Sequence, residues 1–194
     1  MHPFLTTYNE ISLPKLKEAK QYSSSFLVPK VSKVSINCGI GDLAGNDKAI
    51  EDVKTMLRAI SGQEPAITKA RKAIAGFKIR QYAVVGLKVT LRGERMHDFL
   101  TKFTQITLPR TRDFRGLKPT SITADGNLNV GIKDSMIFPE SNQDIPGHSL
   151  QVTLVSNAAS MEEARLLFET LGFVFNQEPE PVKKKKSTYY SKKK

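Results

Sequence analysis

Cysteine, histidine and tryptophan are scarce in this sequence, and their scarcity excludes several kinds of protein. Among 194 residues there are one cysteine, three histidines and no tryptophan. Cys38 alone cannot form an intramolecular disulfide, and His2, His97 and His148 are too far apart in sequence to have the spacing of zinc ligands. A disulfide scaffold and a metal site are therefore excluded, and no cofactor is expected.

Long hydrophobic runs are also missing. No segment reaches the roughly 18 uncharged apolar residues that a transmembrane helix requires, and residues 1–9 lack the basic region and apolar stretch of a signal peptide. The sequence therefore predicts a cytoplasmic protein with no membrane partner. With 39% hydrophobic and 25% charged residues, the composition is that of an ordinary globular protein.

Acidic residues are too few to balance the basic ones, and the imbalance is uneven along the chain. Lysine and arginine number 30 against 19 aspartates and glutamates, which gives a net charge of +11. Residues 69–118 hold 13 basic and 3 acidic groups, whereas residues 119–182 hold 2 basic and 9 acidic groups. A block of cations repels itself unless a polyanion neutralises it. We therefore expect a nucleic acid as partner.

Hydrophobic periodicity predicts an α+β fold. Apolar and polar residues alternate in four predicted strands, over residues 34–38, 85–91, 128–132 and 150–154. Apolar residues at helical spacing predict three helices, over residues 47–61, 96–108 and 161–171. This order favours a mostly antiparallel sheet with helices packed on one face. The other face is open to solvent, and the residues described below make it the predicted RNA-binding face. We expect residues 1–177 to form this single domain.

Local signals define the ends of two of these helices. Asn46 and Ser160 are predicted N-caps, and Ser160 forms a capping box with Glu163. Gly62 and Gly172 are predicted stops.

The middle helix has an apolar stripe that runs from Met96 to Ile106. We expect it to end at Leu108, because Pro109 disfavours helical geometry in the residue before it.

Two of the predicted strands concentrate hydrogen-bond donors and cations on one side. Alternation gives the polar side Lys33, Ser35 and Asn37 from the first strand and Lys88, Thr90 and Arg92 from the second. Lysine and arginine supply charge, while threonine and asparagine can bond the 2′-hydroxyls and phosphates of RNA. Any sheet covered on one side has a polar outer face, but the cationic bias across two strands favours RNA binding.

Residues 66–82 form a second basic region, which contains no acidic residue. It is predicted to be a long, mobile loop whose Ile74, Phe77 and Ile79 either anchor it to the domain or pack on a partner. Its cations, suited to a phosphate backbone, are Lys69, Arg71, Lys72, Lys78 and Arg80.

A third basic cluster combines arginines with one aromatic residue. Residues 108–116 contain Arg110, Arg112, Arg115 and Phe114. This composition suits a phosphate clamp or a protein contact, and it does not distinguish between them.

The glycine-rich turn at residues 39–45 leaves a different function open. It reads G-x-G-x-x-x-G, which differs from the G-x-G-x-x-G of dinucleotide-binding proteins. An RNA- or nucleotide-binding protein that uses this turn is the alternative, and a DNA-binding regulator is a more distant one. No phosphate-binding loop, nucleophile elbow or cysteine–histidine signature is present, so we expect no enzyme.

Several long segments, in order along the chain, resemble the bacterial-type large-subunit ribosomal protein five family. They are SINCGIGD at 35–42, AISGQEPAITKARKAIAGFKIRQ at 59–81, KVTLRGERM at 88–96, LPRTRDFRGL at 108–117 and GNLNVGIKDSMIFPE at 126–140. These segments span most of residues 1–175. The resemblance implies a structural constituent of the large ribosomal subunit that binds 5S rRNA in the central protuberance.

The resemblance also implies sites and partners. It places 5S rRNA contacts at Asn37, Gln63, Thr90 and Arg92, to which strand alternation adds Lys33 and Lys88. The basic loop is expected to contact P-site tRNA. The arginines at 110–115 and the acidic stretch from Asp134 to Asp144 are expected to face a small-subunit head protein. The 23S-type rRNA and neighbouring ribosomal proteins are further implied partners.

The last residues depart from the family pattern with PEPVKKKKSTYYSKKK at 179–194. Residues 178–194 are expected to form a lysine-rich tail that is disordered in isolation. Charge neutralisation, together with base stacking by Tyr189 and Tyr190, could order this tail along rRNA.

Deletion of residues 183–194 is expected to weaken binding to 5S rRNA and to flatten its dependence on salt, because seven lysines no longer displace counterions. Preference for 5S rRNA over a scrambled RNA of equal length should persist. Titration of the full and truncated chains at two salt concentrations measures both quantities. An unchanged affinity and slope would show that the tail only solubilises the protein.

Overall fold

A five-stranded antiparallel sheet organises the computed structural model, which describes residues 3–43, 46–77, 79–112, 114–141 and 147–176. The strands are β1 (Val31–Gly39), β2 (Ala66–Lys69), β3 (Val84–Leu91), β4 (Leu128–Ile132) and β5 (Leu150–Ser156). Their order across the sheet is β2-β3-β1-β5-β4. The predicted α+β class and all four predicted strands are confirmed. The predicted tail, including Tyr189 and Tyr190, lies outside the described residues.

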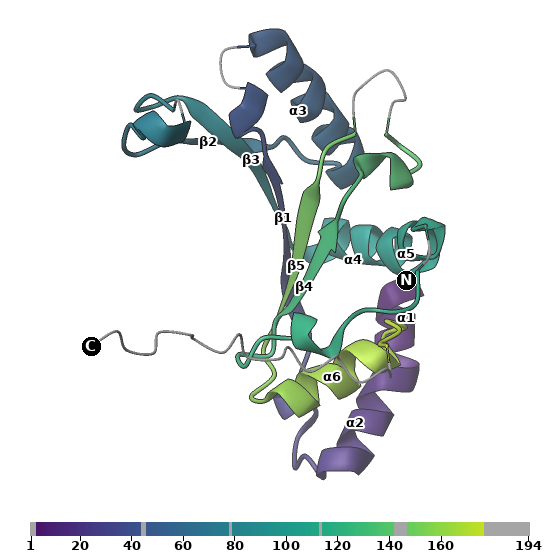
Figure 1. Cartoon of the computed structure of the whole chain (residues 1–194). Coiled ribbons are helices and arrows are strands. Elements are labelled where there is room, and N and C mark those ends of the chain that lie inside the picture. Colours follow the sequence, from purple (N-terminus) through teal and green to yellow (C-terminus); the bar gives the residue numbers. More distant parts are fainter. Residues whose placement is uncertain (1–2, 44–45, 78, 113, 142–146, 177–194) are drawn as a thin grey trace, which may run out of the picture.

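Helices cover one side of this sheet and leave the other side open (Figure 1). They are α1 (Pro3–Thr7), α2 (Leu13–Lys20), α3 (Asp47–Ser61), α4 (Gly93–Lys102), α5 (Leu108–Arg110) and α6 (Met161–Thr170). Short 3-10 turns occupy Ser25–Leu27, Gly41–Leu43, Ala75–Phe77, Pro119–Ser121 and Ser135–Ile137. None of the described helices is long and apolar enough to cross a membrane.

The predicted helix ends at α3 and α6 are confirmed. The Asn46 side chain accepts a hydrogen bond from the Ala49 amide, and Gly62 ends α3 with a φ of 66°. Ser160 caps α6 by accepting from the Glu163 amide. The Glu163 carboxylate accepts in turn from the Ala159 amide at 2.6 Å, one residue before the N-cap. Both helices therefore begin where their own side chains satisfy free backbone amides.

Two helices at the N-terminus were not predicted, because residues 3–20 carry no continuous apolar stripe. Here α1 and α2 are joined by a π-helical turn, Tyr8–Ser12. Tertiary contacts hold this region in place. The Phe4 ring lies 5.7 Å from the His97 ring, and the Tyr8 hydroxyl donates to the Pro29 carbonyl oxygen at 3.1 Å. Packing of scattered residues thus stabilises the helices where periodicity does not.

The predicted end of the middle helix is wrong. The chain continues from α4 through a π-helical turn, Phe103–Thr107, into α5, which contains Pro109. The Leu108 amide donates to the Phe103 carbonyl, five residues back, so the helix gains a residue just before the proline, which has no amide hydrogen. The added residue rotates the buried face. As a result Thr107 is buried, and Ile106, predicted to be in the core, is 43% exposed.

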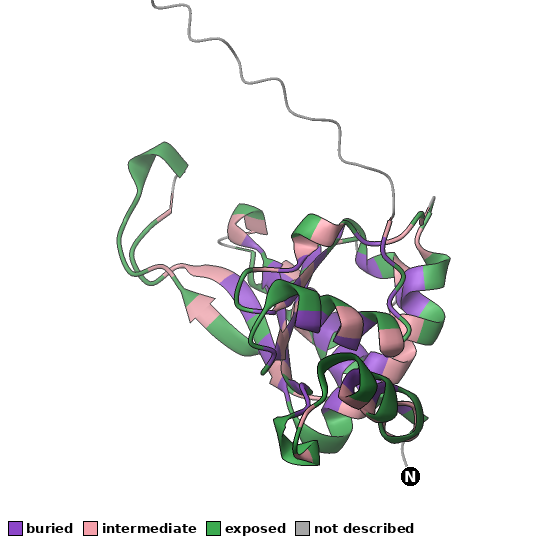
Figure 2. Cartoon of the chain, turned by 90° about the horizontal axis from the view of Figure 1, so that it is seen from below, coloured by how far each residue is buried: buried purple, intermediate pink, exposed green. Residues whose placement is uncertain are grey.

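The prediction of a long loop at residues 66–82 is also wrong where the chain pairs with itself, while its predicted mobility stays a prediction. Residues Ala66–Lys69 form β2, which pairs antiparallel with β3, and the chain beyond them continues as a narrow hairpin with a bridge between Ile74 and Ile79. We call residues 66–84 the basic hairpin. Ile74 and Phe77 are 48% and 75% exposed, so they do not anchor it to the domain. The basic hairpin extends away from the body of the molecule in both views (Figures 1 and 2).

A continuous hydrophobic core, from Phe4 to Phe175, lies between the sheet and the helices. Phenylalanines from distant segments meet at its centre. The Phe103 ring lies 5.6 Å from that of Phe99, 6.4 Å from that of Phe138 and 6.3 Å from that of Phe173. These contacts fix α4 and the C-terminal segment against each other.

Because the π-helical turn buries Phe103 and leaves Ile106 partly exposed, substitutions at these two residues should reduce stability by different amounts. Phe103→Ala should lower the free energy of unfolding by about 3–5 kcal/mol, because it opens a cavity in the core. Ile106→Ala should cost less than about 1 kcal/mol, because that side chain is partly exposed. Urea denaturation of both variants measures the difference. Equal losses would indicate the uninterrupted helical stripe that the sequence suggests.

Candidate nucleic-acid interface

The side of the sheet that faces away from the helices is polar and cationic. We call it the open face. Its residues are Lys33, Ser35, Asn37 and Gly39 of β1, Gly86, Lys88 and Thr90 of β3, Asn129 and Gly131 of β4, and Gln151, Thr153 and Val155 of β5. They alternate with buried residues of the core, as strand geometry requires. No carboxylate occurs among them.

The strand register brings most of the predicted 5S rRNA residues together. Asn37 pairs with Lys88, and Ser35 pairs with Thr90, across the β1–β3 ladder. Lys33 lies two residues before Ser35 on the same face, and the extended backbone of Arg92 directly follows β3. Neighbouring strands lie about 5 Å apart and alternate residues roughly 7 Å apart. These side chains therefore form a compact grid of donors and positive charges.

Gln63 lies at the margin of the open face. Gln63 lies just before β2 begins at Ala66. Its side-chain Nε2 donates to the Thr90 carbonyl oxygen of β3 at 3.5 Å. The next residue, Glu64, is held by α3, because its carboxylate contacts Lys54 Nζ at 2.8 Å and Arg58 Nε at 3.6 Å. The hydrogen bond from Lys54 lowers the pKa of Glu64. This network keeps the acidic group on α3.

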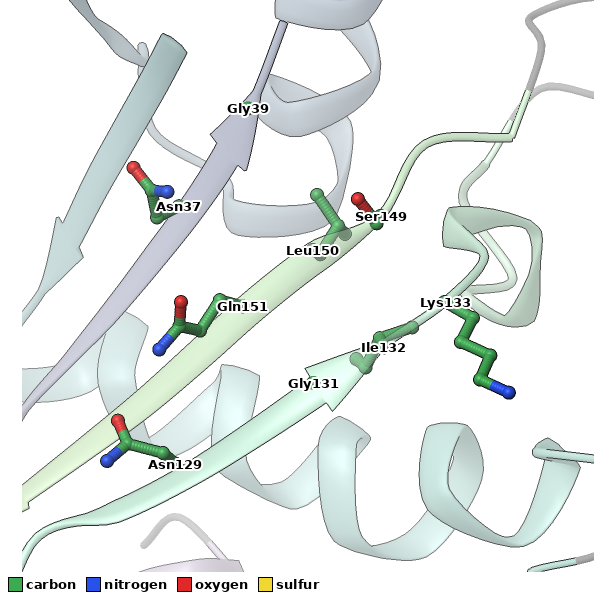
Figure 3. A pocket seen from close by; sticks show the side chains of 9 residues that line it. All are labelled: Asn37, Gly39, Asn129, Gly131, Ile132, Lys133, Ser149, Leu150 and Gln151. Carbon is green, nitrogen blue, oxygen red and sulfur yellow. The ribbon is translucent and has the colours of Figure 1, made fainter. Parts of the chain in front are cut away.

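A row of uncharged amides crosses the open face, and two of its three members, Gln151 and Asn129, were not predicted from the sequence. Asn37, Gln151 and Asn129 come from β1, β5 and β4, and their side chains lie on the same side of the sheet (Figure 3). They border a shallow hollow of about 560 Å³. The Thr153 hydroxyl donates to Asn129 Oδ1 at 2.8 Å, which orients that amide. Strand alternation in β4 and β5 indicates that Asn129 and Gln151 lie on the open face, but they carry no charge and were not among the predicted site residues.

The cysteine beneath the open face is in an environment that disfavours its thiolate form. Cys38 lies on β1 between two open-face residues, but its side chain points into the core and is fully buried. Burial, with a smaller contribution from Asp42, raises the pKa of its thiol to about 11. The thiolate, which is the nucleophilic form, is therefore scarce at neutral pH. Among the described residues, no group of His, Cys, Asp and Glu is arranged to hold a metal ion.

The basic hairpin carries the cations predicted to contact tRNA. The side chains of Lys69, Arg71, Lys72 and Arg80 are exposed, whereas Lys78 lies outside the described residues. The hairpin is braced internally, because Gln81 Nε2 donates to the Arg71 carbonyl oxygen at 3.1 Å. Since β3 belongs to both structures, the hairpin continues directly from the sheet that forms the open face.

The arginine cluster lies apart from the open face, at the end of α5 on the helical side (Figure 1). Arg110, Arg112 and Arg115 are all exposed. Arg110 borders a second hollow, of about 450 Å³, together with Met136 and Phe138. Whatever contacts these arginines approaches the molecule from a different side than a ligand of the open face.

The acidic stretch near this cluster is partly engaged within the chain. Asp134 accepts a hydrogen bond from the Met136 amide at 2.9 Å, and Glu140 pairs with Lys102 Nζ at 2.7 Å. Asp144 lies outside the described residues. The two described carboxylates therefore stabilise their own segment as well as contributing negative charge to it.

The glycine turn does not have the geometry of a phosphate-binding loop. Ile40 at its centre is fully buried, and its amide donates to the Val85 carbonyl oxygen at 3.0 Å. The Leu43 amide donates to the Ile40 carbonyl oxygen, also at 3.0 Å. A phosphate cradle needs free backbone amides and a parallel β-α-β unit, whereas β1 pairs antiparallel with both of its neighbours. Gly45 lies outside the described residues.

Comparison with known proteins confirms the resemblance found in the sequence. The family model of ribosomal protein L5 matches residues 24–80, and that of the ribosomal L5P family C-terminus matches residues 84–175. The chain is 46% identical over 173 residues to large ribosomal subunit protein uL5 of Syntrophomonas wolfei, which covers 87% of this chain and 96% of that protein.

Two further relatives have the same name and similar coverage. Large ribosomal subunit protein uL5 of Synechocystis sp. is 45% identical over 172 residues, and that of Carboxydothermus hydrogenoformans is 44% identical over 172 residues. Each alignment covers 88% of this chain and 96% of the relative. The chain therefore belongs to the uL5 family of large ribosomal subunit proteins, a family of structural ribosome components and not of enzymes.

Proposed function

We propose that this protein, a cytoplasmic component of the large ribosomal subunit, binds 5S rRNA with its open face. Residues 1–177 serve as one rRNA-binding domain, and residues 178–194 add a lysine-rich tail. The observation that carries the proposal is the grid of Lys33, Asn37, Lys88 and Thr90 on an exposed sheet without any carboxylate. Among the described residues, neither of these lysines has an ion-pair partner on the protein.

The chemistry of the open face suits a folded RNA. Lys33, Lys88 and Arg92 supply charge for phosphates, and Asn37 and Thr90 supply donors and acceptors for 2′-hydroxyls and base edges. Gln63 extends the same surface at the edge of β3. Because the sheet is fixed by pairing on both sides of β1, these groups are positioned before RNA binds.

The other two basic surfaces support further contacts in the ribosome. The exposed cations of the basic hairpin suit the backbone of a P-site tRNA. Arg110, Arg112 and Arg115 lie on the helical side and suit an inter-subunit or rRNA contact. With the acidic stretch nearby, this side is our candidate for the bridge to a small-subunit head protein. The 23S-type rRNA and neighbouring ribosomal proteins complete the proposed partners.

The same observations disfavour the two alternatives, a nucleotide-binding protein and a DNA-binding regulator. Nucleotide binding by the glycine turn would need amides that Ile40 and Leu43 already use. A DNA-binding regulator of the recognition-helix type would need its basic residues on one helix, whereas the cations of the open face and of the basic hairpin lie on strands and in the hairpin. Duplex DNA is therefore included in the test below.

Binding to 5S rRNA should persist as salt rises, because a shaped surface adds specific contacts to charge neutralisation. The test titrates the full chain with 5S rRNA, a scrambled RNA of the same length and duplex DNA, each at low and moderately high salt. Thr90→Ala combined with Arg92→Ala should abolish the preference for 5S rRNA. Lys88→Ala should weaken binding to every RNA and reduce the salt slope by about one unit.

The matched control is Lys15→Ala, an exposed lysine of α2 on the helical side. It should leave the preference for 5S rRNA unchanged. If both RNAs lose affinity equally with salt, or if duplex DNA competes as well as 5S rRNA, the protein binds only as a polycation and the proposal fails.

The proposed tRNA contact predicts a separate effect of the hairpin cations. Arg71→Ala combined with Arg80→Ala should weaken the retention of P-site tRNA by ribosomes that carry the variant, while the purified variant keeps its preference for 5S rRNA. Filter binding of tRNA to such ribosomes measures the first effect. Loss of 5S rRNA preference with unchanged tRNA retention would assign the hairpin to 5S rRNA instead.

A further inference from the structure

One residue of the basic hairpin, Tyr82, has a backbone conformation that residues with a side chain rarely adopt. Among the described residues other than glycine, only Gln21 and Tyr82 have a positive φ, of 50° and 66°. The conformation of Gln21 has a structural reason, because its amide donates to the Lys17 carbonyl oxygen and ends α2. Tyr82 is not at the end of a helix.

Tyr82 lies in a β-bulge in the basic hairpin. The Tyr82 amide donates to the Ala70 carbonyl oxygen at 2.9 Å, and the Ala70 amide donates to the Ala83 carbonyl oxygen at 2.9 Å. Two residues of one strand thus oppose one residue of the other. The first bulge position often has left-handed geometry, which glycine adopts without the cost that a side chain brings.

The backbone hydrogen bonds favour this conformation, but no contact of the Tyr82 side chain with the described residues compensates for its cost. The Tyr82 side chain is 69% exposed and belongs to no hydrogen bond or ring contact with the residues that the structure describes. Glycine would make the same backbone hydrogen bonds with less strain. The stability of the fold therefore does not account for a tyrosine here, and unrelieved strain of this kind points to a function.

The surroundings indicate what the ring contacts. The other exposed cations of the basic hairpin include Arg80, Arg71 and Lys72, and residues 65–93 contain no acidic residue. Exposed aromatic rings among cations stack on unpaired bases, while the cations hold the backbone. An apolar protein surface is a poorer match, because so many charges would lose water around a single ring.

We propose that Tyr82 is a stacking platform for an unpaired RNA base at the basic hairpin. The inference rests on the proposed RNA contact of the hairpin and deepens it, since it adds a base contact to a surface otherwise suited only to phosphates. The base belongs either to ribosomal RNA or to tRNA, and the two sources require the same ring chemistry.

The test separates stacking from folding and from charge. Tyr82→Gly should unfold at the same temperature as the parent chain or a higher one, because it relieves the positive φ. Its affinity for at least one of 5S rRNA, large-subunit rRNA and tRNA should fall about fivefold or more, without a change in salt slope. Tyr82→Phe keeps the ring and should bind like the parent chain.

Ultraviolet cross-linking identifies the source of the base. Large subunits without tRNA, and ribosomes with P-site tRNA, are irradiated and digested, and nucleotides attached to Tyr82 are identified by mass spectrometry. An adduct in both samples indicates ribosomal RNA, and an adduct only in the second indicates tRNA. Absence from both, or an unchanged affinity of Tyr82→Gly for all three RNAs, overturns the proposal.

Removal of the hairpin cations distinguishes RNA contact by the basic hairpin from base stacking by Tyr82. If Arg71→Ala with Arg80→Ala weakens RNA binding and lowers its salt slope while Tyr82→Gly has no effect, the hairpin contacts RNA but the stacking role is wrong. If neither change alters binding to any RNA, the hairpin does not contact RNA and both proposals fail.

Discussion

Antiparallel pairing of β1 with both β3 and β5 is the constraint on which the rest of the molecule depends. The apolar side of these three strands, with Val34, Ile36 and Cys38 at its centre, must be buried, and the helices bury it. Because the helices are all used on that side, the opposite side remains exposed along its whole width. The exposed surface is therefore a direct product of the packing that stabilises the protein.

Strand β3 connects the open face to the basic hairpin. At one end of β3, Lys88 and Thr90 belong to the open face, and at the other end the chain becomes the basic hairpin. Backbone hydrogen bonds between β2 and β3 fix the direction in which the hairpin leaves the sheet. A ligand bound to the open face thus has a defined position relative to one held by the hairpin, without a flexible linker between them.

Sequence reasoning found the parts of the fold whose residues are periodic and failed where local packing decides. Alternation at Leu128 and Leu150, and the cap at Ser160, marked elements that the structure confirms. The π-helical turn that buries Thr107 depends on how a helix accommodates Pro109, which periodicity does not describe. The short strand β2 is stabilised by its partner β3, whereas the basic, acid-free segment 66–82 that contains it suggested a loop.

Some residues of the candidate site were predicted from the sequence and others were not. Lys33, Asn37, Lys88 and Thr90 were found because they combine strand alternation with charge or a donor. Gln151 and Asn129 also alternate but carry no charge, and only the strand order shows that they lie beside Asn37. The difference in charge has a consequence for recognition. Lysines bind any phosphate backbone, so in the proposed complex the uncharged donors and acceptors of the open face are the groups that can distinguish one RNA surface from another. Under the proposed function, the lysines supply affinity, and the uncharged groups beside them on β1 and β3, together with Gln151 and Asn129, supply selectivity.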